Sequence, residues 1–150
     1  MIDHPISDTY LDQQQARVFA ALLAAGAWDV TPLILPCAGF EYVTLYISYI
    51  EGGQAVNGAV NWKIESSPDS AGTIWHQLAV YDSGNVIINA DTTSNLQRED
   101  FSYGATTAAI ERFPYGPIPI HGTAERLRVF AREIGDLATP GSCEIEARFS

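Results

Sequence analysis

The sequence predicts an all-β protein: an antiparallel two-sheet sandwich of jelly-roll type, with eight or nine strands and an N-terminal arm. Three observations support this fold class. Two segments within residues 125–149 alternate with period two and are separated by a Pro-Gly loop. Turn-forming residues recur roughly every 8–12 positions after residue 26, and no convincing helical pattern follows that residue. A single closed barrel is the second interpretation.

Length and composition limit the class of protein. The 150 residues are the usual size of one domain and are enough to bury a core. Only 17% of the residues are charged, so Ser, Thr, Asn, Gln and Gly must supply much of the surface. The formal net charge of −10 argues against nucleic acid and against an anionic membrane as partners, because both are bound through basic patches.

The sequence also bears on location and on cysteine chemistry. No apolar run reaches the roughly 18 residues of a membrane span, and residues 1–8 lack the pattern of a signal peptide. We therefore expect synthesis in the cytoplasm. Cys37 and Cys143 do not make a disulfide framework. They are either neighbours, if the first core strand pairs with the last, or two small buried hydrophobic residues.

We divide the chain into an N-terminal arm, residues 1–25, and a β-sandwich domain, residues 26–150. Residues 1–12 are polar, and we expect them to be extended. Residues 13–25 remain open between a short helix and a strand. Their Ala and Leu content favours a helix, whereas the β context that follows slightly favours a strand.

From Trp28 onward the alternation predicts strands. We expect them at 28–35, 41–50, 59–65, 74–81, 86–90 and 101–110, before the closing pair. Gly, Asn, Asp, Ser and Pro gather between them in turns, at 52–58, 66–72 and 82–85. Residues 91–100 form either an edge strand or a long exposed loop. Three prolines between residues 114 and 120 cannot donate to a ladder, so this stretch is predicted to be an edge or crossing segment.

The closing pair has the clearest pattern, and we expect 125–134 and 143–149 to form a hairpin. The outward face of the first strand would carry three basic side chains, those of Arg126, Arg128 and Arg132. The second strand would oppose them with Glu144 and Glu146. Cross-strand pairs of opposite charge stabilise a sheet by roughly 0.2–1 kcal/mol each. If these glutamates do not match the arginines, the arginines form the surface on which an acidic neighbour would dock.

The sequence favours a non-enzymatic protein without a metal or cofactor. Its three histidines, His4, His76 and His121, have no metal-ligand spacing to one another or to a cysteine. It has no Gly-x-Ser-x-Gly motif, and Gly52-Gly53 precedes no helix that would bind a phosphate. Acidic residues such as Asp69 and Asp82 suit calcium, but ordinary turn formation is the better interpretation.

Exposed aromatic and basic residues are the candidate binding groups. Tyr42 and Tyr46 lie on the face opposite Val43 and Leu45, where they suit subunit packing or sugar stacking. The predicted interface residues come from the arm, the aromatic residues and the arginine face: Ile2, Pro5, Ile6, Tyr10, Tyr42, Tyr46, Tyr115, Arg126, Arg128 and Arg132.

The order of these segments resembles small β-sandwich virion proteins of tailed phages and prophages, most of all head decoration proteins. The resemblance covers roughly residues 26–149. It is carried by VTLYISY (43–49), VNWKIESSPD (60–69), IWHQL (74–78), RLRVFAREIG (126–135) and PGSCEIEA (140–147).

The resemblance implies a non-enzymatic protein of the virion, made in the host cytoplasm. Such proteins are often homotrimers that bind the major capsid protein on the head exterior and stabilise the shell. No functional residue is carried over, because the family has no fixed site motif. A tail location stays open, and the alternative function is a carbohydrate-binding module of β-sandwich fold.

Overall fold

The structure, a computed structural model, describes residues 11–53, 58–78, 80–81, 97–98, 101–120, 123–135 and 139–150. Some predictions concern residues outside these ranges. These are the turn at 82–85, the strand at 86–90, His4, His121 and the arm residues Ile2, Pro5, Ile6 and Tyr10. Within the described ranges, no helix is both long enough and apolar enough to cross a membrane.

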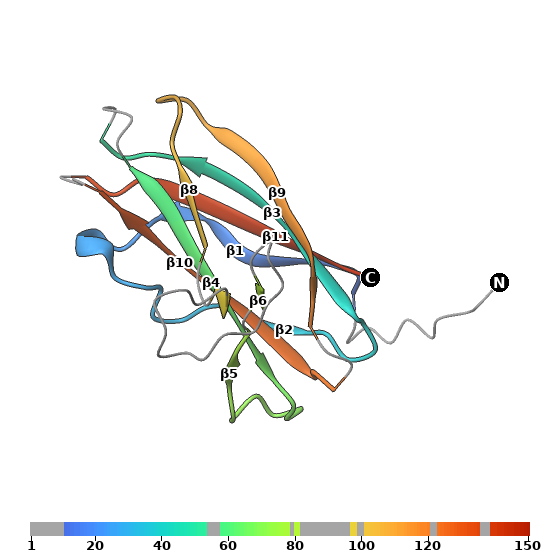
Figure 1. Cartoon of the computed structure of the whole chain (residues 1–150). Helices are drawn as coiled ribbons and strands as arrows, with labels where there is room; N and C mark the ends of the chain where they lie inside the picture. Colours follow the sequence, from blue (N-terminus) through green and yellow to red (C-terminus); the bar gives the residue numbers. More distant parts are fainter. Residues whose placement is uncertain are drawn as a thin grey trace.

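Two antiparallel sheets of four and five strands pack as a β-sandwich, which confirms the all-β prediction (Figure 1). Sheet A contains, in spatial order, β1 (Gln13–Ala21), β11 (Ser142–Phe149), β3 (Tyr42–Ile50) and β9 (Glu111–Pro119). Sheet B contains β2 (Ile34–Pro36), β10 (Arg126–Ile134), β4 (Ala59–Ser67) and β5 (His76–Gln77), with β8 (Phe101–Gly104) also paired to β4. Two short strands, β6 (Val80–Tyr81) and β7 (Gln97–Arg98), pair separately, and a 3-10 turn, η1, spans Ala24–Gly26.

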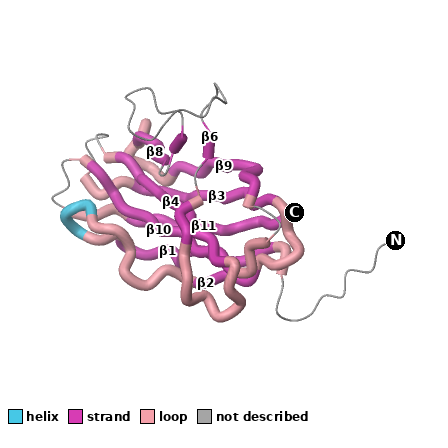
Figure 2. Tube along the Cα trace, turned by 60° about the horizontal axis from the view of Figure 1, so that its bottom comes forward, coloured by secondary structure: helices cyan, strands magenta, loops and turns pink. Residues whose placement is uncertain are grey.

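The two halves of the chain pair in reverse order. β1 pairs with β11, β2 with β10, β3 with β9 and β4 with β8, all antiparallel. From β1 to β4, and again from β8 to β11, consecutive strands alternate between the two sheets (Figure 2). The segments that join these strands therefore cross from one sheet to the other.

The predicted hairpin between residues 125–134 and 143–149 is wrong. β10 lies in sheet B beside β2 and β4, whereas β11 lies in sheet A between β1 and β3. Period-two alternation identifies the buried face of a strand but not the strand beside it. The arginines of β10 consequently face residues of β4, and they do not face Glu144 and Glu146.

Other element boundaries differ from the expectation for local reasons. Residues 13–25, left open between helix and strand, form β1 and then η1. The strand expected at 28–35 is reduced to β2, because Pro32 lacks the N–H that a ladder requires. The proline-rich stretch forms β9, which lies at the edge of sheet A as predicted.

The core lies between the inner faces of the two sheets. In β10, Leu127, Val129 and Ala131 are fully buried and alternate with partly exposed residues. Fully burying a Val or Leu side chain contributes about 1.5–3 kcal/mol. Trp62 is buried, as its alternation with Val60 and Ile64 predicts, and its ring packs on those of Phe101, Phe113 and Tyr115.

Cys37 and Cys143 are both buried and free. The Cys37 N–H donates to the carbonyl of Glu125, just before β10 begins. Cys143 pairs with Tyr49 and Ala20, near the other end of the sandwich. The two cysteines are therefore small apolar core residues and are not neighbours.

Candidate functional site

The outer face of sheet B carries four of the eight Lys and Arg residues of the chain. They are Arg126, Arg128 and Arg132 of β10 and Lys63 of β4, and we call this set the basic strip. The arginines alternate with the buried residues of β10, so they point away from the core, as the sequence predicts. With Glu65 included, the strip has a formal charge of +3, although the whole chain has −10.

Aromatic rings and one carboxylate hold the basic strip in place. Arg128 Nε lies 2.6 Å from Glu65 Oε2, and its guanidinium carbon lies 4.1 Å from the centre of the Trp75 ring. Arg132 donates to Asn61 Oδ1 at 2.7 Å and lies 4.2 Å from the centre of the Trp28 ring. Each such cation–π contact contributes about 0.5–1 kcal/mol at an exposed site. The guanidinium groups of Arg128 and Arg132 are thus pre-positioned on the sheet.

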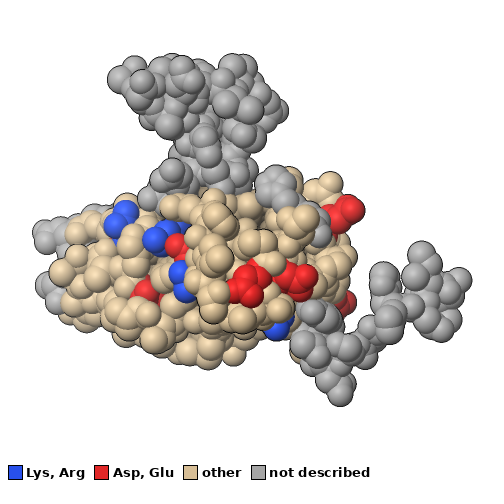
Figure 3. All heavy atoms as spheres, turned by 90° about the horizontal axis from the view of Figure 1, so that it is seen from below, with Lys and Arg blue, Asp and Glu red and all other residues tan. Residues whose placement is uncertain are grey.

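Basic and acidic groups are unevenly distributed on one face of the molecule. On the face shown in Figure 3, most of the basic atoms lie toward one end and most of the acidic atoms toward the other. The arginines of the basic strip are not matched by Glu144 and Glu146, because those glutamates belong to sheet A. The sequence analysis predicts that the arginines form a docking surface for an acidic neighbour if Glu144 and Glu146 do not face them, and in the structure these glutamates do not face them.

The outer face of sheet A presents two tyrosines. Tyr42 is 41% exposed and Tyr46 is 49% exposed, which confirms their predicted outward orientation. Tyr46 lies between Glu146 of β11 and Pro114 of β9. Their role in an interface remains a prediction.

Tyr115 is placed differently from the other predicted interface residues. Its ring is partly buried and packs against the core, 5.2 Å from the centre of Trp62 and 4.7 Å from the centre of Phe101. The aromatic surface of Tyr115 is therefore used for packing between the two sheets.

The structure contains a buried carboxylate, that of Glu133, which the sequence pattern did not identify as a candidate site. Glu133 is 0% exposed, because it continues the inward face of β10 that Leu127 begins. Its Oε1 accepts the Gly52 N–H at 3.2 Å, and its Oε2 accepts the Gly141 N–H at 2.6 Å. This carboxylate fastens the loop after β3 to the loop before β11. The period-two position of Glu133 was the available signal for its burial.

The surroundings of Glu133 are closely packed. The Glu51 carboxylate accepts the Gly58 N–H at 2.8 Å. Burial, and then the charges of Glu133 and Glu51, raise the pKa of the Tyr49 hydroxyl. A Cβ atom at Gly141 would overlap Glu133 Oε2 and the backbone carbonyl oxygen of Ile50, so only glycine allows this approach. The arrangement is that of a structural clamp, in which backbone N–H groups bind carboxylates.

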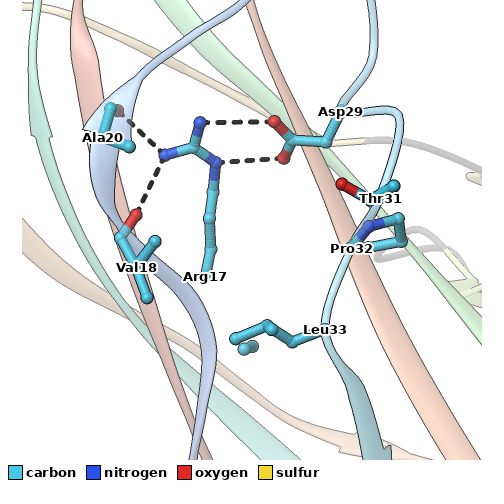
Figure 4. Close-up of a pocket in the computed structure, with 8 residues that line it drawn as sticks. Arg17, Val18, Ala20, Asp29, Thr31, Pro32 and Leu33 are labelled. Atoms are coloured by element: carbon cyan, nitrogen blue, oxygen red, sulfur yellow. Dashed lines mark hydrogen bonds and ion pairs between the residues drawn. The ribbon is translucent and has the colours of Figure 1, made fainter.

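A second buried charge lies where β1 meets the segment 29–33 (Figure 4). Arg17 is 8% exposed and binds both carboxylate oxygens of Asp29, at 3.0 and 3.2 Å. Asp29 also accepts the N–H of Ala131 in β10 at 3.1 Å. The ion pair therefore joins the edge strand of sheet A to sheet B. A hollow of about 130 Å³ adjoins it, lined by Ala16, Arg17, Val18, Ala20, Asp29, Thr31, Pro32 and Leu33.

The described residues contain no group of three or more His, Cys, Asp or Glu side chains placed to hold a metal ion. Asp69 accepts hydrogen bonds from the Thr73 hydroxyl and from the N–H groups of Ala71 and Thr73. These bonds lower its pKa and confirm its interpretation as a turn former. Comparison with protein-family models, with curated proteins and with solved structures finds no match.

Proposed function

We propose that this protein is a non-enzymatic structural protein of a phage virion. In this proposal it is a homo-oligomeric decoration protein, with a trimer favoured, that is made in the host cytoplasm. It docks on the exterior of the head through the basic strip and stabilises the shell. The observation that carries the proposal is the placement of four of the eight basic residues on one sheet face of a −10 chain.

The partner of the basic strip is an acidic patch of the major capsid protein. A guanidinium has five N–H donors in a planar fork that matches a carboxylate. The Arg128 Nε–H is directed to Glu65, and the planar face of the group lies on Trp75. Ordering a freely rotating side chain on binding costs about 0.5–1.5 kcal/mol. An arginine that is already held in place loses less side-chain entropy than this.

We further propose that the sandwich is of jelly-roll type. This is supported by the nested pairing of β1 with β11, β2 with β10, β3 with β9 and β4 with β8. Jelly rolls recur in viral capsid proteins and in lectins. A fold does not establish a function by itself, so the docking proposal depends on the basic strip.

The proposal is tested with capsids assembled from the major capsid protein of the phage or prophage that encodes this chain. We expect the wild-type protein to co-sediment with these capsids and to raise the temperature at which they break open. An Arg128→Glu variant should bind at least about tenfold more weakly, because it opposes like charges at the contact.

Arg148→Glu is the matched control, since Arg148 is exposed on sheet A and pairs with Glu146 at 2.8 Å. This variant should bind as the wild type does. If the wild-type protein does not bind capsids, the proposed function is wrong. If Arg128→Glu binds normally, the docking face lies elsewhere.

A carbohydrate-binding module is the second candidate. The observation that favours it is the pair of exposed rings of Tyr42 and Tyr46 on one face of β3. Aromatic rings with one open face stack on sugars. Binding to a glycan array that is lost in Tyr46→Ala and kept in Arg128→Glu would support this alternative over capsid docking.

A further inference from the structure

One edge of the sandwich exposes an unusual number of apolar side chains. Of the ten large hydrophobic side chains that the described residues expose, five lie between residues 18 and 34. We call these five the neutral edge: Val18, Phe19, Val30, Leu33 and Ile34. They come from β1, from the segment leading into β2 and from the first residue of β2, and β1 and β2 are the neighbouring edges of the two sheets. Clustered exposed apolar groups mark interaction sites.

The neutral edge carries no net charge. Between residues 13 and 36, Arg17 and Asp29 are the only charged residues, and they bind each other at 3.0 Å. Apart from this pair, residues 13–36 contribute no charged group, although Arg128 of β10 lies across from Ile34. A second copy of a −10 chain is repelled over most of the molecule. Two copies therefore approach most easily through this neutral region.

A second copy that approaches this edge would meet side chains and would not add a strand to sheet A. The pairing of β1 with β11 shifts register between Arg17 and Ala20. The Arg17 guanidinium donates to the carbonyls of Val18, Ala20 and Ala21, at 3.3, 3.0 and 3.1 Å. A neighbouring strand cannot use those acceptors in a regular ladder. The irregularity instead leaves Val18 52% exposed and Phe19 51% exposed.

A hollow lies beside Val18, the neighbour of Phe19 in the chain. Its lining includes Val18, Pro32 and Leu33, and the Arg17–Asp29 pair closes one side (Figure 4). A surface that has an apolar projection next to an apolar hollow can complement a copy of itself.

We propose that the neutral edge is the surface through which copies of this chain associate, with Phe19 of one protomer packed against the hollow of the next. This inference deepens the proposed function, because it identifies the self-contact of the proposed oligomer. The neutral edge borders the basic strip at Ile34, which lies across from Arg128 in the pairing of β2 with β10. Phe19 and the hollow lie on β1 and the segment 29–33, and the basic strip lies on β10 and β4.

Sedimentation velocity from micromolar to millimolar protein tests the inference. We expect the wild-type protein to associate and Phe19→Ser to raise the dissociation constant at least about tenfold, as for a residue central to an interface. Ile74→Ser is the matched control, because Ile74 is 58% exposed and lies outside the neutral edge. The control should associate as the wild type does.

Thermal unfolding of each variant checks that the fold is kept. Val30→Ser is a second variant, because Val30 is 80% exposed and its replacement leaves the core intact. An oligomer that neither Phe19→Ser nor Val30→Ser weakens overturns the inference but leaves capsid docking unaffected. A wild-type protein that is monomeric throughout overturns both the inference and the oligomeric part of the proposed function, while capsid binding is still measured separately.

Discussion

Glu133 is an acidic residue in a core position, and two loops depend on it. Backbone N–H groups of Gly52 and Gly141 both donate to its carboxylate. Hydrogen bonds to a charged acceptor contribute about 1.5–3 kcal/mol each, and removal of the acceptor leaves buried donors unsatisfied. The stability of this end of the sandwich therefore depends strongly on one side chain.

We expect Glu133→Ala to lower the free energy of unfolding by about 2–4 kcal/mol in urea titrations followed by tryptophan fluorescence. Glu144→Ala is the control, since Glu144 lies on the outward face of β11. The control should change the free energy by less than about 0.5 kcal/mol. Equal effects of the two substitutions would contradict the clamp.

The two thiols should be unreactive in the folded protein. Burial raises the pKa of Cys37 and of Cys143 from an ordinary value of 9.0 to about 12, and nearby Arg126 and Arg17 lower these values only in part. Because the thiolate is the reactive form, alkylation of the folded protein at pH 8 should be about a thousandfold slower than alkylation of the unfolded chain. Mass spectrometry after timed treatment with iodoacetamide measures this. Rapid labelling of either cysteine under native conditions would contradict it.

The same pKa values predict that the free energy of unfolding falls at alkaline pH. The folded pKa of each thiol lies above the unfolded one, so the neutral thiol favours the folded state. This contribution is complete below about pH 9 and is lost as the pH rises toward 12. Unfolding titrations should therefore show a decline over this window that is shallower in a Cys37→Ala/Cys143→Ala variant.

At the scale of an element, β1 is an edge strand that a buried ion pair attaches to sheet B. Its Arg17 reaches Asp29, which in turn accepts the N–H of Ala131 in β10. The ion pair is largely buried, so breaking it leaves an uncompensated charge at the junction of the two sheets. The attachment of β1 to sheet B depends on this pair.

We expect Arg17→Met to lower the free energy of unfolding by about 2–4 kcal/mol, since the Asp29 carboxylate loses its partner. The double variant Arg17→Met/Asp29→Leu should recover part of that loss, because it leaves no unpaired charge. Chemical unfolding of the two single variants and the double variant gives the coupling energy. Simple additivity of the two substitutions would contradict the proposed coupling.

The element β10 shows what alternation can and cannot predict. Its period-two pattern predicts that Arg126, Arg128 and Arg132 share the outward face, and the structure confirms this. The pattern also placed Glu144 and Glu146 across from them, which is wrong because β4 is the neighbour. Trp28 and Trp75, which cover the guanidinium groups, come from segments outside any strand. Their approach to β10 is a long-range contact that local patterns do not contain.

At the scale of the whole molecule, the nested winding separates strands that are adjacent in the sequence. The strands β10 and β11 each carry a clean alternation, and a short loop usually joins such strands as a hairpin. In this fold the loop crosses between the sheets, so each strand pairs with a distant part of the chain. The basic strip, which combines β10 and β4, and the neutral edge, which combines β1 and β2, are assembled by this winding.

The sequence by itself determined the all-β class, the inward and outward faces of β3, β10 and β11, and the edge position of β9. These follow from side-chain alternation and from the missing N–H of proline, which are local properties. The tertiary structure alone decided which strands pair. It therefore also decided that Arg128 binds Glu65, that Glu133 joins two loops and that Arg17 binds Asp29. Pairing is set by burying all the apolar faces at once, and this requirement involves the whole chain.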